Sequence, residues 1–529
     1  MTAHAAGCAM VVADHATMAG LPAPALLAAL LAALILTLWS LRRGAAGLEG
    51  RSATPRFDLL SVAPFRSLVS RRPFQFALQL PLVLALFLIL SAGFLGSPVA
   101  ERNIATVLTW TIWWTLLIVD IVLLGRTWCL VCPWDALASW MRRLAFWRRR
   151  PEEPLALELK WPRWLKNVYP ATLLFVGLTW LELGFGVTRS PRATAILGLL
   201  MLMLAVVPAL LFERRSFCRY GCLIGRICGL YSMLAPVEVR PRSLDVCGAC
   251  RTKACFAGNG KGYPCPTGQC LPAMKVNTYC TLCTECVKSC PEENVAINVR
   301  PWGADLQSPA GPRRDEAVLA LVMLSLTSFH GLTMTPAWNG ALAWLRGLTG
   351  MRHLSVFSIG MAAVLVAPAL AYLLFSAAAV RRARPRAEAG AFRPALALAA
   401  GRYAYPLIAV ALMYHLAHNL GHLLTEAGSL VPVLSDPFGS GQDLLGTAGF
   451  APTALAAPAS IWTIQIALVL TGLVWALRAT ERTHRWLAKD WSIGSLPLAA
   501  RVITAAFILI MTAANLWLLA QPMEMRTGM

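Results

Sequence analysis

The stretch that decides the fold is YPLIAVALMYHLAHNLGHLL, residues 405–424. Most of its side chains are apolar, and twenty residues of α-helix span about 30 Å, the hydrocarbon thickness of a bilayer. The stretch therefore predicts a membrane-spanning helix. Its three histidines are polar groups in an apolar setting, and polar groups inside a membrane are commonly functional.

Similar apolar runs recur along the chain. The 529 residues are 57% apolar and only 14% charged, whereas soluble domains are about 45–50% apolar. This composition predicts an all-α polytopic membrane protein. We predict ten spans, near residues 22–41, 75–95, 104–124, 168–187, 194–212, 316–334, 353–378, 403–425, 460–477 and 502–520.

The basic residues are distributed very unevenly. If the N-terminus lies outside, the loops that face the cytoplasm hold 41 of the 47 Lys and Arg residues. Cytoplasmic loops of membrane proteins carry such an excess. We therefore predict a multi-pass protein of a bacterial-type inner membrane, with both termini outside. The net charge of +21 is then a topology signal, so no nucleic-acid partner is expected.

The spans fall into two sets of five, separated by about 100 residues rich in Cys, Gly, Pro and charge. Such a segment is too polar to cross a bilayer and too long for a simple connection. We expect it to form a small cytoplasmic α+β insert. The predicted divisions are an outer tail (1–21), a first bundle (22–212), the insert (213–315) and a second bundle (316–529).

The sharpest motif is CTLCTECVKSCP, residues 280–291. Its spacing, C-x2-C-x2-C-x3-C-P, is that of bacterial ferredoxins. Fourteen of the 15 cysteines map to the cytoplasmic side, where disulfides are rare. The motif therefore predicts iron–sulfur cluster binding. A zinc ribbon, the alternative, uses two well-separated C-x2-C pairs.

A second set of cysteines precedes this motif, in CGACRTKACFAGNGKGYPCPTGQC, residues 247–270. In two-cluster ferredoxins the cysteine before proline binds the other cluster. We therefore predict two [4Fe–4S] clusters in a ferredoxin-like insert, with Cys270 spare or in place of Cys265. The predicted ligands are Cys247, Cys250, Cys255 and Cys290 for one cluster, and Cys280, Cys283, Cys286 and Cys265 for the other.

Two further pairs of cysteines follow the inner ends of spans, in RTWCLVCPWD (126–135) and RSFCRYGCLIGRIC (215–228). If the two spans are neighbours, four thiols converge at the membrane surface. They would bind a third cluster or copper, or act as a redox dithiol, although buried cysteines also pack as small apolar residues. The candidate residues of this third site are Cys129, Cys132, Cys218 and Cys222.

The motifs CLVCPWDAL, CRYGCLIG and CTLCTECVKSCP together resemble the NapH/NosR/CcoG class of membrane-bound polyferredoxins, over about residues 75–300. That class usually has C-x3-C-P at both membrane-proximal positions, whereas this chain has C-x2-C-P and C-x3-C-L. The resemblance implies electron transfer between the quinone pool, cytoplasmic clusters and extracytoplasmic partners, or metal reduction during oxidase assembly. The second set of five spans lies outside it.

Five of the eight histidines map to the outer half of the second bundle. Three of them recur at i, i+3 and i+7 on one helix face. Imidazole suits haem iron and copper, so we considered haem b, copper, quinol binding and plain interhelical hydrogen bonding. Glu182 is a further ionisable group in the outer half and a candidate proton relay. The candidate residues are His330, His415, His418 and His422, with His330 pairing with His415 or His418 if haem is bound.

These observations predict a membrane-integral iron–sulfur electron-transfer protein. It would link the quinone pool or a cytoplasmic donor to an unidentified extracytoplasmic acceptor, through haem b if that is present. The alternative is a copper or iron reductase or assembly factor for a respiratory enzyme. No nucleotide-binding fingerprint occurs, so we expect a redox component that depends on partners.

Overall fold

The computed structural model describes residues 17–43, 55–144, 155–307, 311–383 and 389–526. Within these ranges, nine helical segments are long and apolar enough to cross a membrane. The predicted all-α polytopic membrane protein is thereby confirmed. Most of the predicted outer tail, 1–21, lies outside the described residues. The nine segments are α1 (Ala23–Arg43), α3 (Phe74–Leu95), Ile104–Leu124, α9 (Pro191–Leu211), α15 (Arg314–Thr333), α17 (His353–Ala383), Ala391–Ser435, α20 (Pro458–Asp490) and α21 (Leu498–Leu519).

Two of these segments are composite. The first consists of α4 (Ile104–Thr106), a π-helical stretch (Val107–Trp113) and α5 (Trp114–Leu124). Such π-helical turns are frequent at functional sites. The second contains most of α18 (Ala389–Glu426) and continues to α19 (Leu430–Ser435).

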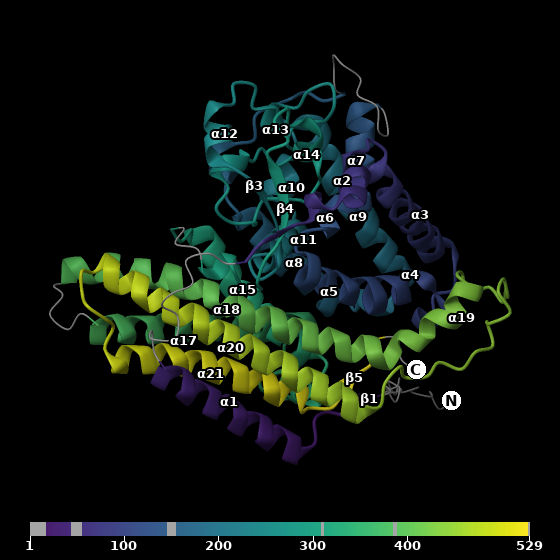
Figure 1. The fold of residues 1–529 in the computed structure, drawn as a ribbon. Coiled ribbons are helices and arrows are strands. Elements are labelled where there is room, and N and C mark those ends of the chain that lie inside the picture. Colours follow the sequence, from purple (N-terminus) through teal and green to yellow (C-terminus); the bar gives the residue numbers. More distant parts are fainter. Residues whose placement is uncertain (1–16, 44–54, 145–154, 308–310, 384–388, 527–529) are drawn as a thin grey trace, which may run out of the picture.

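The predicted span 168–187 corresponds to a shorter helix, α8 (Tyr169–Gly184), of 16 residues. At 1.5 Å per residue it is about 24 Å long. The short strands β1 (Thr17–Met18) and β5 (Met523–Glu524) pair with each other, so the two described ends of the chain lie on the same side (Figure 1). An even number of crossings is then required, and we infer that α8 supplies the tenth.

The grouping of helices differs from the predicted division at residue 213. The first predicted span, α1, packs against α20 and α21 of the second bundle (Figure 1). Arg501 at the start of α21 donates a hydrogen bond to the carbonyl of Leu41. This docking could not be predicted from the sequence, because α1 is apolar on every face. The remaining early helices, α3, α4 and α9, pack together with α7 (Pro133–Arg143).

The helix α18 is enclosed on all sides. Every residue from 406 to 419 is buried, and α15 and α20 are its main neighbours. A Cβ added to Gly472 of α20 would lie 2.9 Å from the carbonyl oxygen of Ala409, so these two helices approach closely there. This enclosure explains why the stretch 405–424 carries apolar residues around the whole helix, with its histidines as the exception.

A small domain beside the helices carries the nine cysteines from Cys247 to Cys290; we call it the cysteine domain. Its three-stranded antiparallel sheet has the order β2 (Phe57–Asp58), β4 (Val295–Val299), β3 (Val237–Pro241). Short helices α12 (Leu244–Ala249), α13 (Ala254–Ala257) and α14 (Glu285–Ser289) lie beside it (Figure 1). Strand β2 and helix α2 (Ala63–Ser70) come from before α3, so the domain extends beyond the predicted 213–315.

Candidate redox centres

The cysteine domain brings distant cysteines together in two groups. In the first, burial raises the pKa of Cys280 to about 11, with a contribution from the neighbouring Cys265 thiol. Burial raises the pKa of Cys283 to about 12, again with Cys265 adding to the effect. Cys286 has Cys283, Cys280 and Cys265 as neighbours. The structure therefore places Cys265 beside the three cysteines predicted to share its cluster.

In the second group, burial raises the pKa of Cys247, and the thiols of Cys290, Cys250 and Cys270 raise it further. Burial likewise raises the pKa of Cys255, whose thiol neighbours are Cys270, Cys290 and Cys247. This group contains the four predicted ligands and one more, Cys270. Cys270 lies with this group and not beside Cys280 or Cys283, and its role as a ligand in place of Cys265 stays a prediction.

Hydrogen-bond donors point at several of these sulfurs. The backbone N–H of Gln269 donates to Cys265 Sγ at 3.2 Å, and Asn294 Nδ2 donates to Cys247 Sγ at 3.3 Å. Backbone N–H groups of Leu282 and Glu285 donate to Cys280 and Cys283. Donors of this kind favour thiolates and tune cluster potentials. The two groups thus have the donor set and surroundings that a pair of [4Fe–4S] clusters requires.

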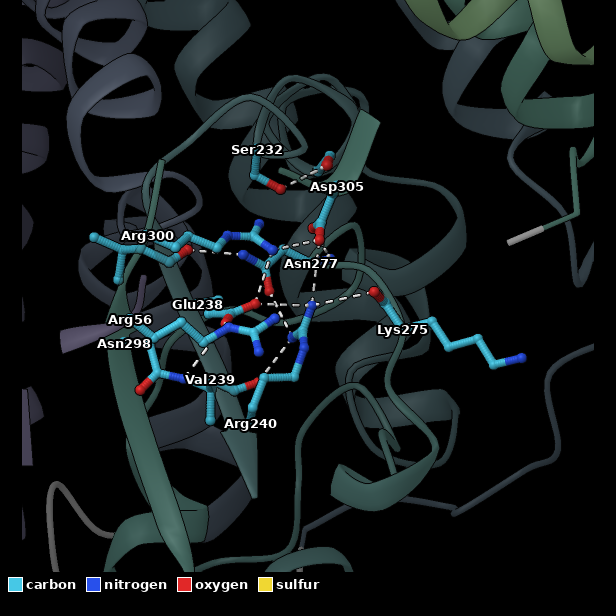
Figure 2. Close-up of polar contacts among 12 residues, drawn as sticks. Arg56, Ser232, Glu238, Val239, Arg240, Lys275, Asn277, Asn298, Arg300 and Asp305 are labelled. Carbon is cyan, nitrogen blue, oxygen red and sulfur yellow. Dashed lines mark hydrogen bonds and ion pairs between the residues drawn. The ribbon is translucent and has the colours of Figure 1, made fainter. Parts of the chain in front are cut away.

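A buried ion network fixes the loop that precedes Cys280 (Figure 2). The fully buried Glu238 contacts Arg300 at 2.8 Å and Arg240 at 3.3 Å. Asp305 contacts both arginines and accepts from the backbone N–H of Asn277 at 2.7 Å. The network therefore joins β3 and β4 to residues three positions before the cysteine motif. Sequence reasoning did not find it, because its members are scattered along the chain.

The predicted third site is also assembled. Burial raises the pKa of Cys218, and Asp135, Cys222 and Cys132 raise it further. Burial raises the pKa of Cys222 to about 11, with Cys129 as the nearest thiol. The two motifs, 90 residues apart in sequence, therefore meet as predicted.

Two residues outside the four predicted ligands also belong to this site. Cys228 is fully buried with Cys129 and Cys222 as neighbours. Arg126, 1% exposed, donates from Nε to Cys129 Sγ at 3.2 Å. Its other nitrogens donate to the carbonyls of Cys218 and Thr278, each at 3.1 Å. This one guanidinium thus joins both thiol motifs to the cysteine domain.

A cavity of about 1740 Å³ connects the third site with the cysteine domain. Cys218 lines it on one side, and Cys265 and Cys283 line it on the other. Arg143 and Arg215 are among its further lining residues.

A second cavity, of about 1320 Å³ including its open part, lies within the helices. Five tryptophans line it, and we call it the tryptophan cavity. Near one end are Trp128, which precedes Cys129, and Leu223, which follows Cys222. His330, His415 and Glu182 also line it. The five tryptophans are Trp110, Trp113, Trp114, Trp128 and Trp134.

Aromatic rings form an unbroken series along this cavity. The ring centroids of Trp128 and Trp113 are 5.2 Å apart, and those of Trp113 and Trp114 are 5.7 Å apart. Trp114 is 6.0 Å from His415, whose Nδ1 is 3.4 Å from the hydroxyl of Tyr231. The cavity therefore extends from the third site to the histidines, with flat apolar walls.

The histidines of α18 lie on one side of the helix, as predicted, and His330 of α15 joins them. The ring centroids of His330 and His418 are 5.7 Å apart, and those of His418 and His422 are 4.8 Å apart. His422 Nδ1 lies 2.6 Å from the carboxylate of Glu426. His415 contacts Tyr231 and Trp114 instead, so only three of the four histidines form a continuous series.

A buried charge cluster lies where α18 ends. The backbone N–H of Arg526 donates to Glu426 Oε2 at 3.1 Å, and its guanidinium donates to Asn419 Oδ1 at 2.7 Å. Glu426 is 0% and Arg526 4% exposed. Sequence reasoning missed both residues, because Arg526 stands near the C-terminus, about 100 positions from its partners.

Among the described residues, no group of three or more His, Cys, Asp or Glu side chains is arranged around a single metal ion. A [4Fe–4S] cluster takes one thiolate at each of four irons, so its ligands do not converge on one point. The copper and haem interpretations of the histidines stay predictions.

No protein-family model matches the chain, and no solved structure matches it. One curated protein, "Putative electron transport protein YccM" of Escherichia coli (strain K12), is 30% identical over 124 residues. The match covers 22% of this chain and 29% of the E. coli protein. The chain therefore spans less than a third of that relative's length, and its similarity is to part of a protein named for electron transport.

Proposed function

We propose that this chain is a membrane-integral iron–sulfur electron-transfer protein. Two [4Fe–4S] clusters in a ferredoxin-like cysteine domain would exchange electrons with the quinone pool through the third thiol site and the tryptophan cavity. One cluster would be held by Cys280, Cys283, Cys286 and Cys265. The other would be held by Cys290 with Cys247, Cys250 and Cys255, or with Cys270 in place of one of these.

The observation that carries the proposal is the continuity of the thiol groups. Cys218 of the third site faces the same cavity as Cys265 and Cys283. On its other side, the third site adjoins Trp128 and Leu223 in the wall of the tryptophan cavity. A redox path would therefore lead from the cysteine domain into the membrane through neighbouring thiols and aromatic rings.

The tryptophan cavity suits a quinone. Ligand sites are mainly apolar and aromatic, with a few polar groups that fix orientation. Here the polar groups include Glu182, whose Oε1 is buried without a hydrogen-bond partner, and His330 and His415. A quinone ring has two carbonyl oxygens that accept protons on reduction, and these side chains are suited to supply them.

The charge distribution supports the orientation in the membrane. With 41 of 47 basic residues on its side, the cysteine domain would face the cytoplasm. The donor would then be cytoplasmic or the quinone pool itself. An extracytoplasmic redox partner would dock at the opposite end.

The proposal is tested by oxidising dithionite-reduced protein in nanodiscs with a short-chain quinone, following the visible absorbance of the clusters. Leu197→Trp fills the tryptophan cavity and is expected to slow this reaction at least about tenfold. Leu200→Trp is the matched control, because Leu200 lies on the same helix, is 43% exposed and does not line the cavity. Ferricyanide should oxidise both variants equally. Equal quinone rates in both variants would refute the cavity as the quinone site.

A second candidate, a copper or iron assembly factor, is favoured by the convergence of Cys129, Cys132, Cys218 and Cys222. Copper that co-purifies with the protein and is lost in Cys129→Ser and Cys132→Ser would support it. Rapid quinone-dependent oxidation of the clusters, unaffected by copper chelation, would support electron transfer.

A further inference from the structure

Three histidines and one glutamate form a row through the helical bundle; we call His330, His418, His422 and Glu426 the histidine row. Successive ring centroids are 5.7 and 4.8 Å apart. The last step, from His422 Nδ1 to Glu426 Oε1, is a direct hydrogen bond of 2.6 Å. A ring rotation or one bridging water completes each imidazole-to-imidazole step.

The middle of the row is unusual in its hydrogen bonding. His418 is 2% exposed, and neither of its ring nitrogens has a partner. His422 is fully buried, and its Nε2 also lacks a partner. Buried polar atoms nearly always have hydrogen-bond partners, and a missing partner destabilises the fold. Nitrogens left unpaired in a line point to a use in which they bind and release protons in turn.

The row begins at the tryptophan cavity. Of the described residues that line this cavity, three carry side chains that titrate, namely Glu182, His330 and His415. His415 is engaged with the hydroxyl of Tyr231, whereas His330 faces His418. Near the third site, the lining residues Leu223 and Ile224 offer no proton donor. Protons that enter the cavity along the protein therefore have their acceptors at its histidine end.

The row ends at the side of the molecule where β1 and β5 pair, which we call the terminal face. Glu426 is the last residue of α18, and Arg526, two residues after β5, bonds to its carboxylate. Arg526 is a charged group packed against the row, and its guanidinium donates a hydrogen bond to Asn419. This buried pair stabilises the ionised carboxylate at the exit.

We propose that the histidine row conducts protons between the tryptophan cavity and the terminal face. This inference rests on the proposed quinone chemistry. It adds that the protons of this chemistry are exchanged at the terminal face. Reduction of a bound quinone consumes two electrons, which arrive from the cysteine side, and two protons, which arrive along the row. Oxidation of the quinol returns two electrons to the thiol groups and releases two protons toward the terminal face.

The experiment uses the complete protein in liposomes that contain a ubiquinone analogue in the bilayer and a pH-indicator dye in the lumen. Dithionite added outside reduces molecules whose cysteine domain faces outward. With the wild type, the lumen is expected to become alkaline as the quinone is reduced. Protein-free liposomes correct for direct reduction of the quinone by dithionite, which draws no protons from the lumen through the row.

Two variants interrupt the row, His418→Gln and His422→Gln. Each is expected to slow the alkalinisation of the lumen about a hundredfold, the typical contribution of a positioned proton-transfer group. His353→Gln, at the exposed start of α17 and outside the row, is the matched control and should behave like the wild type. Iron content and quenching of tryptophan fluorescence by the quinone should be unchanged in all three variants, because neither His418 nor His422 lines the cavity.

Several results would overturn the inference. One is unchanged alkalinisation in both row variants, and another is quinone reduction by the wild type without any alkalinisation of the lumen. A haem absorbance band lost in His418→Gln would make the row a ligand set instead. If quinone fails to oxidise the clusters at all, the proposed function itself is wrong and the inference falls with it.

Discussion

Glu238 is the residue whose substitution tests how the cysteine domain is held together. Its carboxylate is fully buried and contacts Arg300 at 2.8 Å, Arg240 at 3.3 Å and Arg56 at 2.8 Å (Figure 2). Glu238→Gln keeps the size and one acceptor but removes the charge. We expect the variant to loosen β3, β4 and the loop before Cys280.

The expected cost follows from the contacts. A hydrogen bond to a charged group contributes about 1.5–3 kcal/mol, and a neutral one about 0.5–1.5 kcal/mol, so each buried contact loses about 1 kcal/mol. The side chains of Arg300 and Arg240 are 2% and 12% exposed, whereas that of Arg56 is 52% exposed and its pair contributes little. The opening free energy of the sheet should fall by about 2 kcal/mol, or roughly 30-fold in equilibrium constant.

Hydrogen exchange of the complete protein in nanodiscs measures this change directly. Amides in Val237–Pro241 and Val295–Val299 should exchange about 30-fold faster in Glu238→Gln. Asp245→Asn, an exposed acid in the same domain, should leave them unchanged. Acceleration below about twofold, or equal acceleration in α20, would refute the view that this network stabilises the domain locally.

Four further results are expected. Cys265→Ser should lose about four of the eight cluster irons, and Cys270→Ser should keep the cluster that Cys265 serves, as iron and sulfide assays would show. Arg126→Gln should speed hydrogen exchange around Cys218 more than around Thr278, because the Cys218 carbonyl loses a donor at about 1–3 kcal/mol whereas the Thr278 carbonyl keeps the Arg226 guanidinium; unchanged exchange would contradict this. Glu182→Gln should slow oxidation of the clusters by quinone about tenfold or more without weakening quinone binding. Removal of iron by a chelator should make residues 244–294 sensitive to protease while the helical segments stay protected, and equal protection with and without iron would argue against clusters as part of that core.

The helical architecture was predictable because one physical requirement dominates it. A membrane crossing needs about 20 apolar residues, and nine of the ten predicted spans coincide with helices that meet this requirement. The tenth, α8, is four residues shorter than such a run. The docking of α1 against α20 and α21 was not predictable, because apolar helix faces pack against one another without a sequence code that names the partner.

The cysteine groups were predictable for a chemical reason. Three thiolates that share one cluster must lie close in a loop, so their spacing is constrained. Cys270 has no such spacing, and only the fold places it with Cys247 and Cys255. Strand β2 escaped prediction because two residues carry no periodic pattern.

The surroundings of the histidines could be predicted only in part. Their helical spacing predicted a shared face, but a sequence does not tell which neighbouring side chains meet that face. Glu426 continues the row one turn further along α18, at i+4 from His422, and was in principle visible. Arg526 was not, because it reaches Glu426 only through the return of the chain at β5.

The placement of the two paths has an electrical consequence. On the proposals above, electrons reach the tryptophan cavity from the cysteine side, and protons reach it from the terminal face. For each electron that reduces the quinone, the electron crosses part of the membrane from the cysteine side to the cavity. One proton crosses the remaining part from the terminal face to the cavity. The two partial movements add up to one charge across the whole membrane. A potential of 100 mV, negative on the cysteine side, therefore favours quinone reduction by about 2.3 kcal/mol per electron and opposes quinol oxidation equally. If protons entered from the cysteine side instead, this dependence would nearly vanish, because both charges would then travel the same partial path and cancel.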